Sequence, residues 1–134
     1  MRRVLLILKP TVVERKLIGK VLSFYEGSGF RIEDLKITKL YELENVINDD
    51  VMKKVGMNFR LENRVVIVVL LYDNFNLNFE ELKSELKIYL KTINRNSEGN
   101  EIYMYYNEDV NEVIEVLFPK VSKFAFKGSK ATSV

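Results

Sequence analysis

The sequence predicts an α+β domain of the ferredoxin-like split βαβ type, a four-stranded antiparallel sheet with helices on one face plus a helical insert. Residues 4–8 and 65–71 are uninterrupted apolar runs rich in branched side chains, which are typical of central strands buried on both faces. Segments with helical periodicity alternate with the strand patterns. The 134 residues, 47% of them hydrophobic, are enough for one core and too few to suggest two domains.

The first half of the chain alternates strand, helix and strand. After the run at 4–8, Thr11 and Glu14 have the spacing of a capping box, and apolar residues at helical spacing then extend to the glycines near residue 27. This pattern predicts one continuous helix. Residues 30–40 alternate in polarity, but the apolar phase slips between Ile32 and Leu35. We therefore predict an edge strand with a bulge near Asp34.

The second half repeats the alternation after a helical insert. Residues 41–63 predict one or two short helices, joined near residues 48–50. Asn78 predicts the start of a helix that ends near residue 93, residues 101–106 predict the last strand, and Asp109 with Glu112 predicts a capped helix that stops before Pro119. We expect one domain over residues 1–126 and a disordered tail over residues 127–134, which are small and polar.

Composition excludes several function classes. The chain contains no histidine and no cysteine, so it lacks the residues of an ordinary zinc site and of thiolate or imidazole catalysis. We predict no metal site. The net charge of +2 is too small to indicate a nucleic-acid or membrane partner. No run approaches the roughly 18 apolar residues of a membrane span, and we expect an intracellular, cytoplasmic protein.

One stretch resembles a known family. The sequence KPTVVERKLIG at residues 9–19 resembles the KPDGVxRGLVG signature of nucleoside diphosphate kinases, and the similarity continues without a gap to Lys36. Weaker similarity covers residues 64–71 and 109–118. The resemblance implies the same ferredoxin-like fold, and a ping-pong transfer of a terminal phosphate between nucleotides through a phosphohistidine.

The chain departs from that family at the catalytic position. The family histidine lies in an N-x-x-H-G-S-D pattern, and aligning Asn100 with its asparagine places Tyr103 where the histidine belongs. A tyrosine with a pKa of about 10 is protonated at neutral pH, unlike a histidine with a pKa of about 6.5. Thr11 and Val12 also replace the aspartate and glycine of KPDG. We therefore expect no catalytic residue and an inactive relative of the family.

Some binding residues have counterparts. The resemblance implies that Lys9 contacts a nucleotide phosphate, and lysine suits that role as a point charge. Arg95 and Asn100, in a loop that is shorter than the family's, are weaker candidates. The arginine that the family has near the start of helix 78–93 has only Lys83 or Lys87 as a counterpart. No cofactor is required, and a magnesium nucleotide is the candidate ligand.

Three functions remain open at the level of sequence. The first is an inactive assembly or nucleotide-sensing module. The second is a phosphotransferase that uses another nucleophile such as Tyr103. The third is a ferredoxin-like RNA-binding domain that stacks bases on Tyr103, Tyr105 and Tyr106, although the small net charge makes nucleic acid an unfavourable partner.

The resemblance also implies assembly. Family members pair through the edge strand that follows the first helix, and the long loop before their last strand contributes to hexamers. The edge strand at 30–40 is present here and the loop is short. Because an unpaired edge must be paired or protected, we expect a homodimer through residues 30–40.

Overall fold

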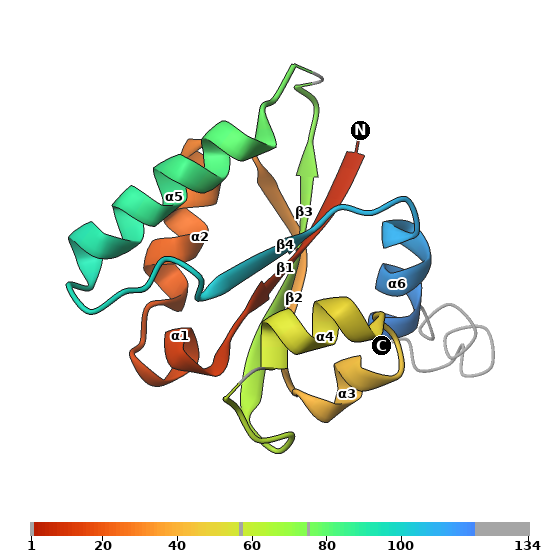
Figure 1. Ribbon diagram of the computed structural model, residues 1–134. Coiled ribbons are helices and arrows are strands. Elements are labelled where there is room, and N and C mark those ends of the chain that lie inside the picture. The colour runs from red at the N-terminus through yellow and green to blue at the C-terminus, as the bar shows by residue number, and fades with distance from the viewer. Residues whose placement is uncertain (1, 57, 75, 120–134) are drawn as a thin grey trace, which may run out of the picture.

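The computed structural model describes residues 2–56, 58–74 and 76–119 (Figure 1). These residues form a four-stranded sheet in the order β2-β3-β1-β4, and every neighbouring pair is antiparallel. The strands are β1 (Arg2–Leu8), β2 (Arg31–Lys39), β3 (Arg64–Tyr72) and β4 (Ile102–Tyr105). The helices are α1 (Pro10–Glu14), α2 (Ile18–Gly27), α3 (Tyr41–Glu44), α4 (Asp49–Gly56), α5 (Phe79–Ile93) and α6 (Val110–Leu117).

The two apolar runs are the central strands, as predicted. β1 pairs with β3 from Arg2↔Tyr72 to Leu8↔Val66 and with β4 on its other side. Because successive residues of a strand point to opposite faces, a strand between two others buries every side chain when both faces are covered. Residues 4–8 of β1 and 65–70 of β3 are all buried.

Helices cover both faces of the sheet (Figure 1). On one face α1, α2 and α5 pack on a cluster that includes Leu6 and Leu8 of β1. On the other, the helical insert of α3 and α4 packs on a cluster that includes Leu5 and Ile7. The predicted fold class is confirmed, and the structure adds that α6 joins the insert on the second face. Four buried residues of α6 explain this placement: Val110, Val113, Ile114 and Leu117.

The prediction of one long first helix was wrong. The chain forms α1, then turns through Lys16, whose φ of 57° lies in the left-handed region, before α2 begins at Ile18. The predicted capping box of Thr11 and Glu14 was also wrong, because both residues lie inside α1, which Lys9 precedes without a side-chain cap. Pro10 at the first helical position accounts for the start, since its fixed φ suits a helix and its missing N–H costs nothing there.

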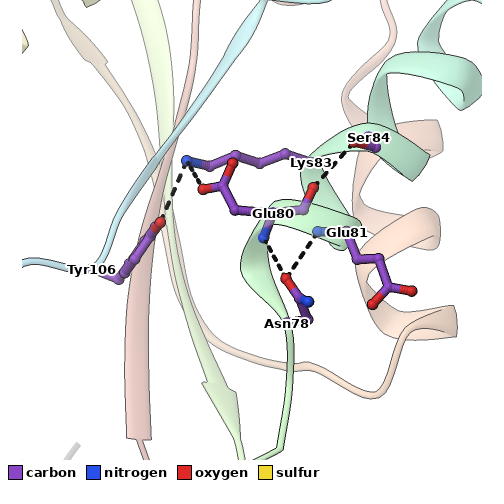
Figure 2. Close-up of polar contacts among 6 residues, drawn as sticks. All are labelled: Asn78, Glu80, Glu81, Lys83, Ser84 and Tyr106. Carbon is purple, nitrogen blue, oxygen red and sulfur yellow. Dashed lines mark hydrogen bonds and ion pairs between the residues drawn. The ribbon is translucent and has the colours of Figure 1, made fainter.

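Several local predictions are confirmed. The register of β2 against β3 shifts between Ile32 and Asp34, which is the predicted bulge. Residues 41–56 form two short helices. Asn78 caps α5, its side-chain oxygen accepting hydrogen bonds from the backbone N–H groups of Glu80 and Glu81 (Figure 2).

The predicted side-chain cap at the start of α6 is not formed. Asp109 precedes the helix, but its Oδ1 accepts a 2.6 Å hydrogen bond from the Tyr105 hydroxyl instead. The hydroxyl of a largely buried tyrosine needs a partner, and this aspartate supplies one.

Two remaining sequence predictions concern where the domain ends and whether a helix crosses a membrane. The predicted domain boundary at residue 126 and the predicted tail at 127–134 lie outside the described residues. Among the helices that the structure does describe, none has both the length and the apolar character needed to cross a membrane.

Candidate functional site

A cavity of 580 Å³ lies where the end of β1, the start of β4, the α5 helix and the segment after α4 come together. Its size falls within the roughly 300–1,000 Å³ typical of small-molecule sites. Lys9 and Tyr103, which the sequence placed at one site, both line it, and so does Asn100. We call it the Lys9 cavity.

Lys9 stands at the junction between β1 and α1. Its backbone is extended (φ −65°, ψ 163°), and its N–H donates a 2.9 Å hydrogen bond to the carbonyl oxygen of Glu101. This bond continues the β1–β4 ladder one residue past Leu8↔Ile102. Burial lowers the pKa of Lys9, and the nearby carboxylates of Glu101 and Glu98 partly oppose that shift.

Positive side chains dominate the lining of the Lys9 cavity. Two acidic residues, Glu98 and Glu101, share that lining with a larger cationic set. The cations are Lys9, Arg15, Lys54, Lys83 and Lys87. An excess of positive charge in a concave site favours an anionic ligand such as a phosphate ester.

Lys83 is held at the start of α5 (Figure 2). Its Nζ lies 3.4 Å from the hydroxyl of Tyr106 and 3.5 Å from a carboxylate oxygen of Glu80, and Figure 2 shows both contacts. The Tyr106 ring stacks on Phe79 with 4.3 Å between ring centroids. Burial alone would lower the pKa of Lys83, but the contacts with Tyr106 and Glu80 outweigh it and raise that pKa. Lys83 therefore stays charged at the wall of the cavity.

The three tyrosines in and directly after β4 have different environments. Tyr103 is half-buried and lines the Lys9 cavity. Tyr105 is buried, and burial together with its hydrogen bond to Asp109 raises its pKa. Tyr106 packs against α5. The three rings therefore do not form one exposed platform on which bases could stack, and the structure gives no support to the RNA-binding alternative.

The structure brings together most of the residues that the sequence singled out. Lys9, Asn100 and Tyr103 line one cavity, as do Lys83 and Lys87, the two lysines that lie near the position where the resemblance predicts an arginine. Arg95 is exposed, and the described lining of the cavity does not include it.

The sequence analysis missed Lys54, Phe59 and Glu101. Phe59 is half-buried and follows Asn58, whose φ of 69° turns the chain after α4. No motif marks these positions. The one available signal was an isolated aromatic residue in the polar stretch after α4. Within residues 2–56, 58–74 and 76–119, no group of three or more acidic side chains could hold a metal ion.

The chain is similar in sequence to known proteins over a short stretch. No protein-family profile matches the chain. Over 36 residues the chain is 44% identical to the nucleoside diphosphate kinase of Clostridium perfringens strain SM101, and the match covers 27% of this chain and 25% of that relative. The proteins of two further strains match equally. The chain thus spans about 25% of the length of the curated relatives it matches.

Solved structures match over nearly the whole chain. A nucleoside diphosphate kinase of Aquifex aeolicus superimposes with a TM-score of 0.57 at 20% identity, over 90% of this chain and 96% of that one. The Halobacterium salinarum enzyme in complex with CDP gives 0.56 at 17% identity, covering 89% and 88%. The Borrelia burgdorferi enzyme with bound vanadate and ADP gives 0.54 at 18% identity, covering 89% and 88%. The chain has the fold of nucleoside diphosphate kinases, and the predicted resemblance is confirmed.

Proposed function

We propose that this chain is a divergent relative of the nucleoside diphosphate kinases that binds a nucleotide in the Lys9 cavity without transferring its phosphate. The observation behind the proposal is the position of the cavity: the lysine of the KP signature lies in its wall, among cations from α4 and α5. Two structural neighbours, solved with CDP and with ADP and vanadate, make a nucleotide the first ligand to test.

The lining of the Lys9 cavity suits the two halves of a nucleotide. Lys54 and Lys87 offer ammonium groups to phosphate oxygens. Phe59, Leu86 and Met104 provide apolar and aromatic surface for a base. Charge on one part of the ligand and apolar surface on another is the combination that this lining recognises.

The residues do not favour phosphate transfer, because the sequence has no histidine to form a phosphohistidine. Tyr103, which the sequence resemblance aligns with the family histidine, lines the cavity, but a phenol is a weak nucleophile and a phosphotyrosine is a poor phosphate donor. Catalysis of phosphoryl transfer also depends on precise positioning of the phosphate. A nucleotide-binding, catalytically inactive protein is the function that these residues favour.

The second candidate is an active phosphotransferase with Tyr103 as its nucleophile. The presence of Tyr103 and Lys9 in one cavity favours it. A Tyr103→Phe variant separates the two candidates, because it abolishes transfer through the phenol and leaves nucleotide affinity nearly unchanged.

Assembly is the other half of the proposal. Strand β2 is an edge of the sheet, and Ile32, Leu35 and Ile37 on it are 36%, 41% and 53% exposed. Their partners in β3 are Leu70, Val68 and Val66, which face the α2 and α5 side. The three exposed side chains therefore form an apolar stripe on that side, and a second copy of the chain would cover it in a homodimer.

Calorimetric titration with ATP, ADP and GDP, with and without magnesium, tests the binding proposal. We expect saturable binding that weakens at least tenfold in Lys9→Ala, since a hydrogen bond to a charged group contributes about 1.5–3 kcal/mol. Lys91→Ala is the matched control, because Lys91 is exposed on α5 and lies outside the lining. The proposal would be contradicted if none of the three nucleotides bound to the wild type, or if Lys9→Ala bound them as tightly as the wild type does.

A further inference from the structure

Three cations in the lining of the Lys9 cavity have no carboxylate partner. Arg15 directly follows α1, Lys54 lies on α4 and Lys87 lies on α5, so three different helices bring them to one cavity. Within residues 2–56, 58–74 and 76–119, none of the three forms an ion pair. We call them the three-helix cations. Like charges that converge on one concave site repel one another, and a polyanion bound there would relieve that repulsion.

The other two cations of the lining are already compensated by carboxylates. Lys83 lies 3.5 Å from a carboxylate oxygen of Glu80. Glu101 and Glu98 act on Lys9, whose pKa they raise against the effect of burial. The positive charge that remains uncompensated in the lining is therefore that of the three-helix cations.

Lys87 is positioned at the cavity wall by a glycine. A β-carbon at Gly99 would lie 3.0 Å from Cγ of Lys87, closer than most β-carbons approach a neighbouring atom, so the stem of the lysine packs directly on the backbone of the loop before β4. Gly99 itself lines the cavity, and its φ of 82° favours glycine. A stem held in this way loses less conformational freedom when its ammonium binds an anion.

The sequence resemblance makes a magnesium nucleotide the expected ligand, but the donor set of the cavity does not suit the metal. Magnesium that accompanies a nucleotide is held by one or two carboxylates together with phosphate oxygens. Glu101 is 6% exposed and one of its carboxylate oxygens is buried, so Glu98 is the exposed carboxylate of the lining. A divalent cation would enter this cavity among like charges, which weaken binding when they are brought together. The residues therefore fit the phosphates and do not fit the metal.

We propose, resting on the nucleotide-binding function above, that the Lys9 cavity selects nucleoside polyphosphates that carry no magnesium, and that the three-helix cations determine this selectivity. Magnesium cancels part of the negative charge of a diphosphate or triphosphate, and that charge is what the three-helix cations attract. A metal-free polyphosphate meets them with its full charge.

Equilibrium titration of ADP at matched ionic strength, in excess EDTA and in excess magnesium chloride, tests this selectivity. It compares the wild type with Lys54→Gln/Lys87→Gln and with a control, Lys53→Gln/Lys91→Gln. Lys53 and Lys91 lie on the same two helices and are exposed, but they are not among the residues that line the cavity. Glutamine keeps a long side chain and a helix propensity close to that of lysine, so both variants should fold.

We expect the wild type and the control variant to bind ADP at least about tenfold more tightly in EDTA than in magnesium. Lys54→Gln/Lys87→Gln should lose most of that difference, because its affinity for metal-free ADP falls more than its affinity for the magnesium complex. The inference would be overturned, with the proposed function left in place, if the wild type bound the magnesium complex equally or more tightly. A difference that persists in Lys54→Gln/Lys87→Gln, or that is lost equally in the control variant, would also overturn it. Failure of ADP to bind under either condition would instead refute the proposed function, and this inference with it.

Discussion

Ile37→Arg in the edge strand is the perturbation that most sharply tests the proposed homodimer. Ile37 is 53% exposed in the single chain. Full burial of an isoleucine contributes about 1.5–3 kcal/mol, so covering the exposed half contributes about 1 kcal/mol per copy. An isologous interface contains the residue twice, and the loss is about 2 kcal/mol before the cost of desolvating two guanidinium groups.

That loss corresponds to a dimer dissociation constant raised at least about thirtyfold. The fold itself should tolerate the change, because exposed substitutions usually alter the free energy of unfolding by about 0.5 kcal/mol or less. Light scattering coupled to size-exclusion chromatography, over a tenfold range of concentration, measures the mass. Wild type should elute as a dimer and Ile37→Arg should shift toward the monomer.

Ile88→Arg is the matched control, since Ile88 is 70% exposed on α5 and lies away from the edge strand. It should leave the mass unchanged. A wild-type monomer at every concentration would refute the assembly proposal. A dimer that withstands Ile37→Arg, or one that dissociates equally in Ile88→Arg, would show that the interface lies elsewhere.

Three further outcomes are expected. Tyr103→His should not create nucleoside diphosphate kinase activity, because phosphoryl transfer depends on precisely positioned cationic groups and α5 contains no arginine; phosphate exchange above a Lys9→Ala sample purified in parallel would contradict this. Nucleotide affinity should fall as pH rises through the lowered pKa of Lys9, in a window below its usual 10.5, and Lys9→Arg should remove that fall. Without ligand, the free energy of unfolding should instead rise with pH over the same window, because Lys9 binds its proton more tightly in the unfolded chain than in the folded one. Asn78→Ala should lower the free energy of unfolding by about 1 kcal/mol in urea titrations, as it removes the cap bonds of 3.0 and 3.1 Å, while Asn78→Asp should not.

The predictions from sequence succeeded where a local pattern determines the structure. Two uninterrupted apolar runs could be buried only as central strands, and the phase slip after Ile32 located the bulge. The Asn78 cap followed from the preference of asparagine for that position. The first helix was mispredicted because the chain turns at Lys16, which adopts a left-handed conformation although it is not a glycine. The position of α6 depends on which face of the sheet the other helices leave uncovered. A local sequence pattern does not indicate that.

The site was predictable only in part. Lys9, Asn100 and Tyr103 could be placed together because they align with motifs of the family that the sequence resembles, with Tyr103 at the position of its histidine. Lys54 and Phe59 come from the helical insert and reach the cavity through tertiary packing. Glu101 looked like an ordinary charged residue before a strand, and its burial shows only in the folded protein.

Equilibrium dialysis against ATP labelled in its γ-phosphate, with a second nucleoside diphosphate present, tests the central claim of binding without transfer most directly. Chromatography of the label after equilibration reports both steps at once. We predict that label accumulates on the protein side and that all of it remains in ATP. Label in the triphosphate formed from the second nucleoside diphosphate, or label attached covalently to the protein, would contradict the account. Failure of the label to accumulate on the protein side would also contradict it.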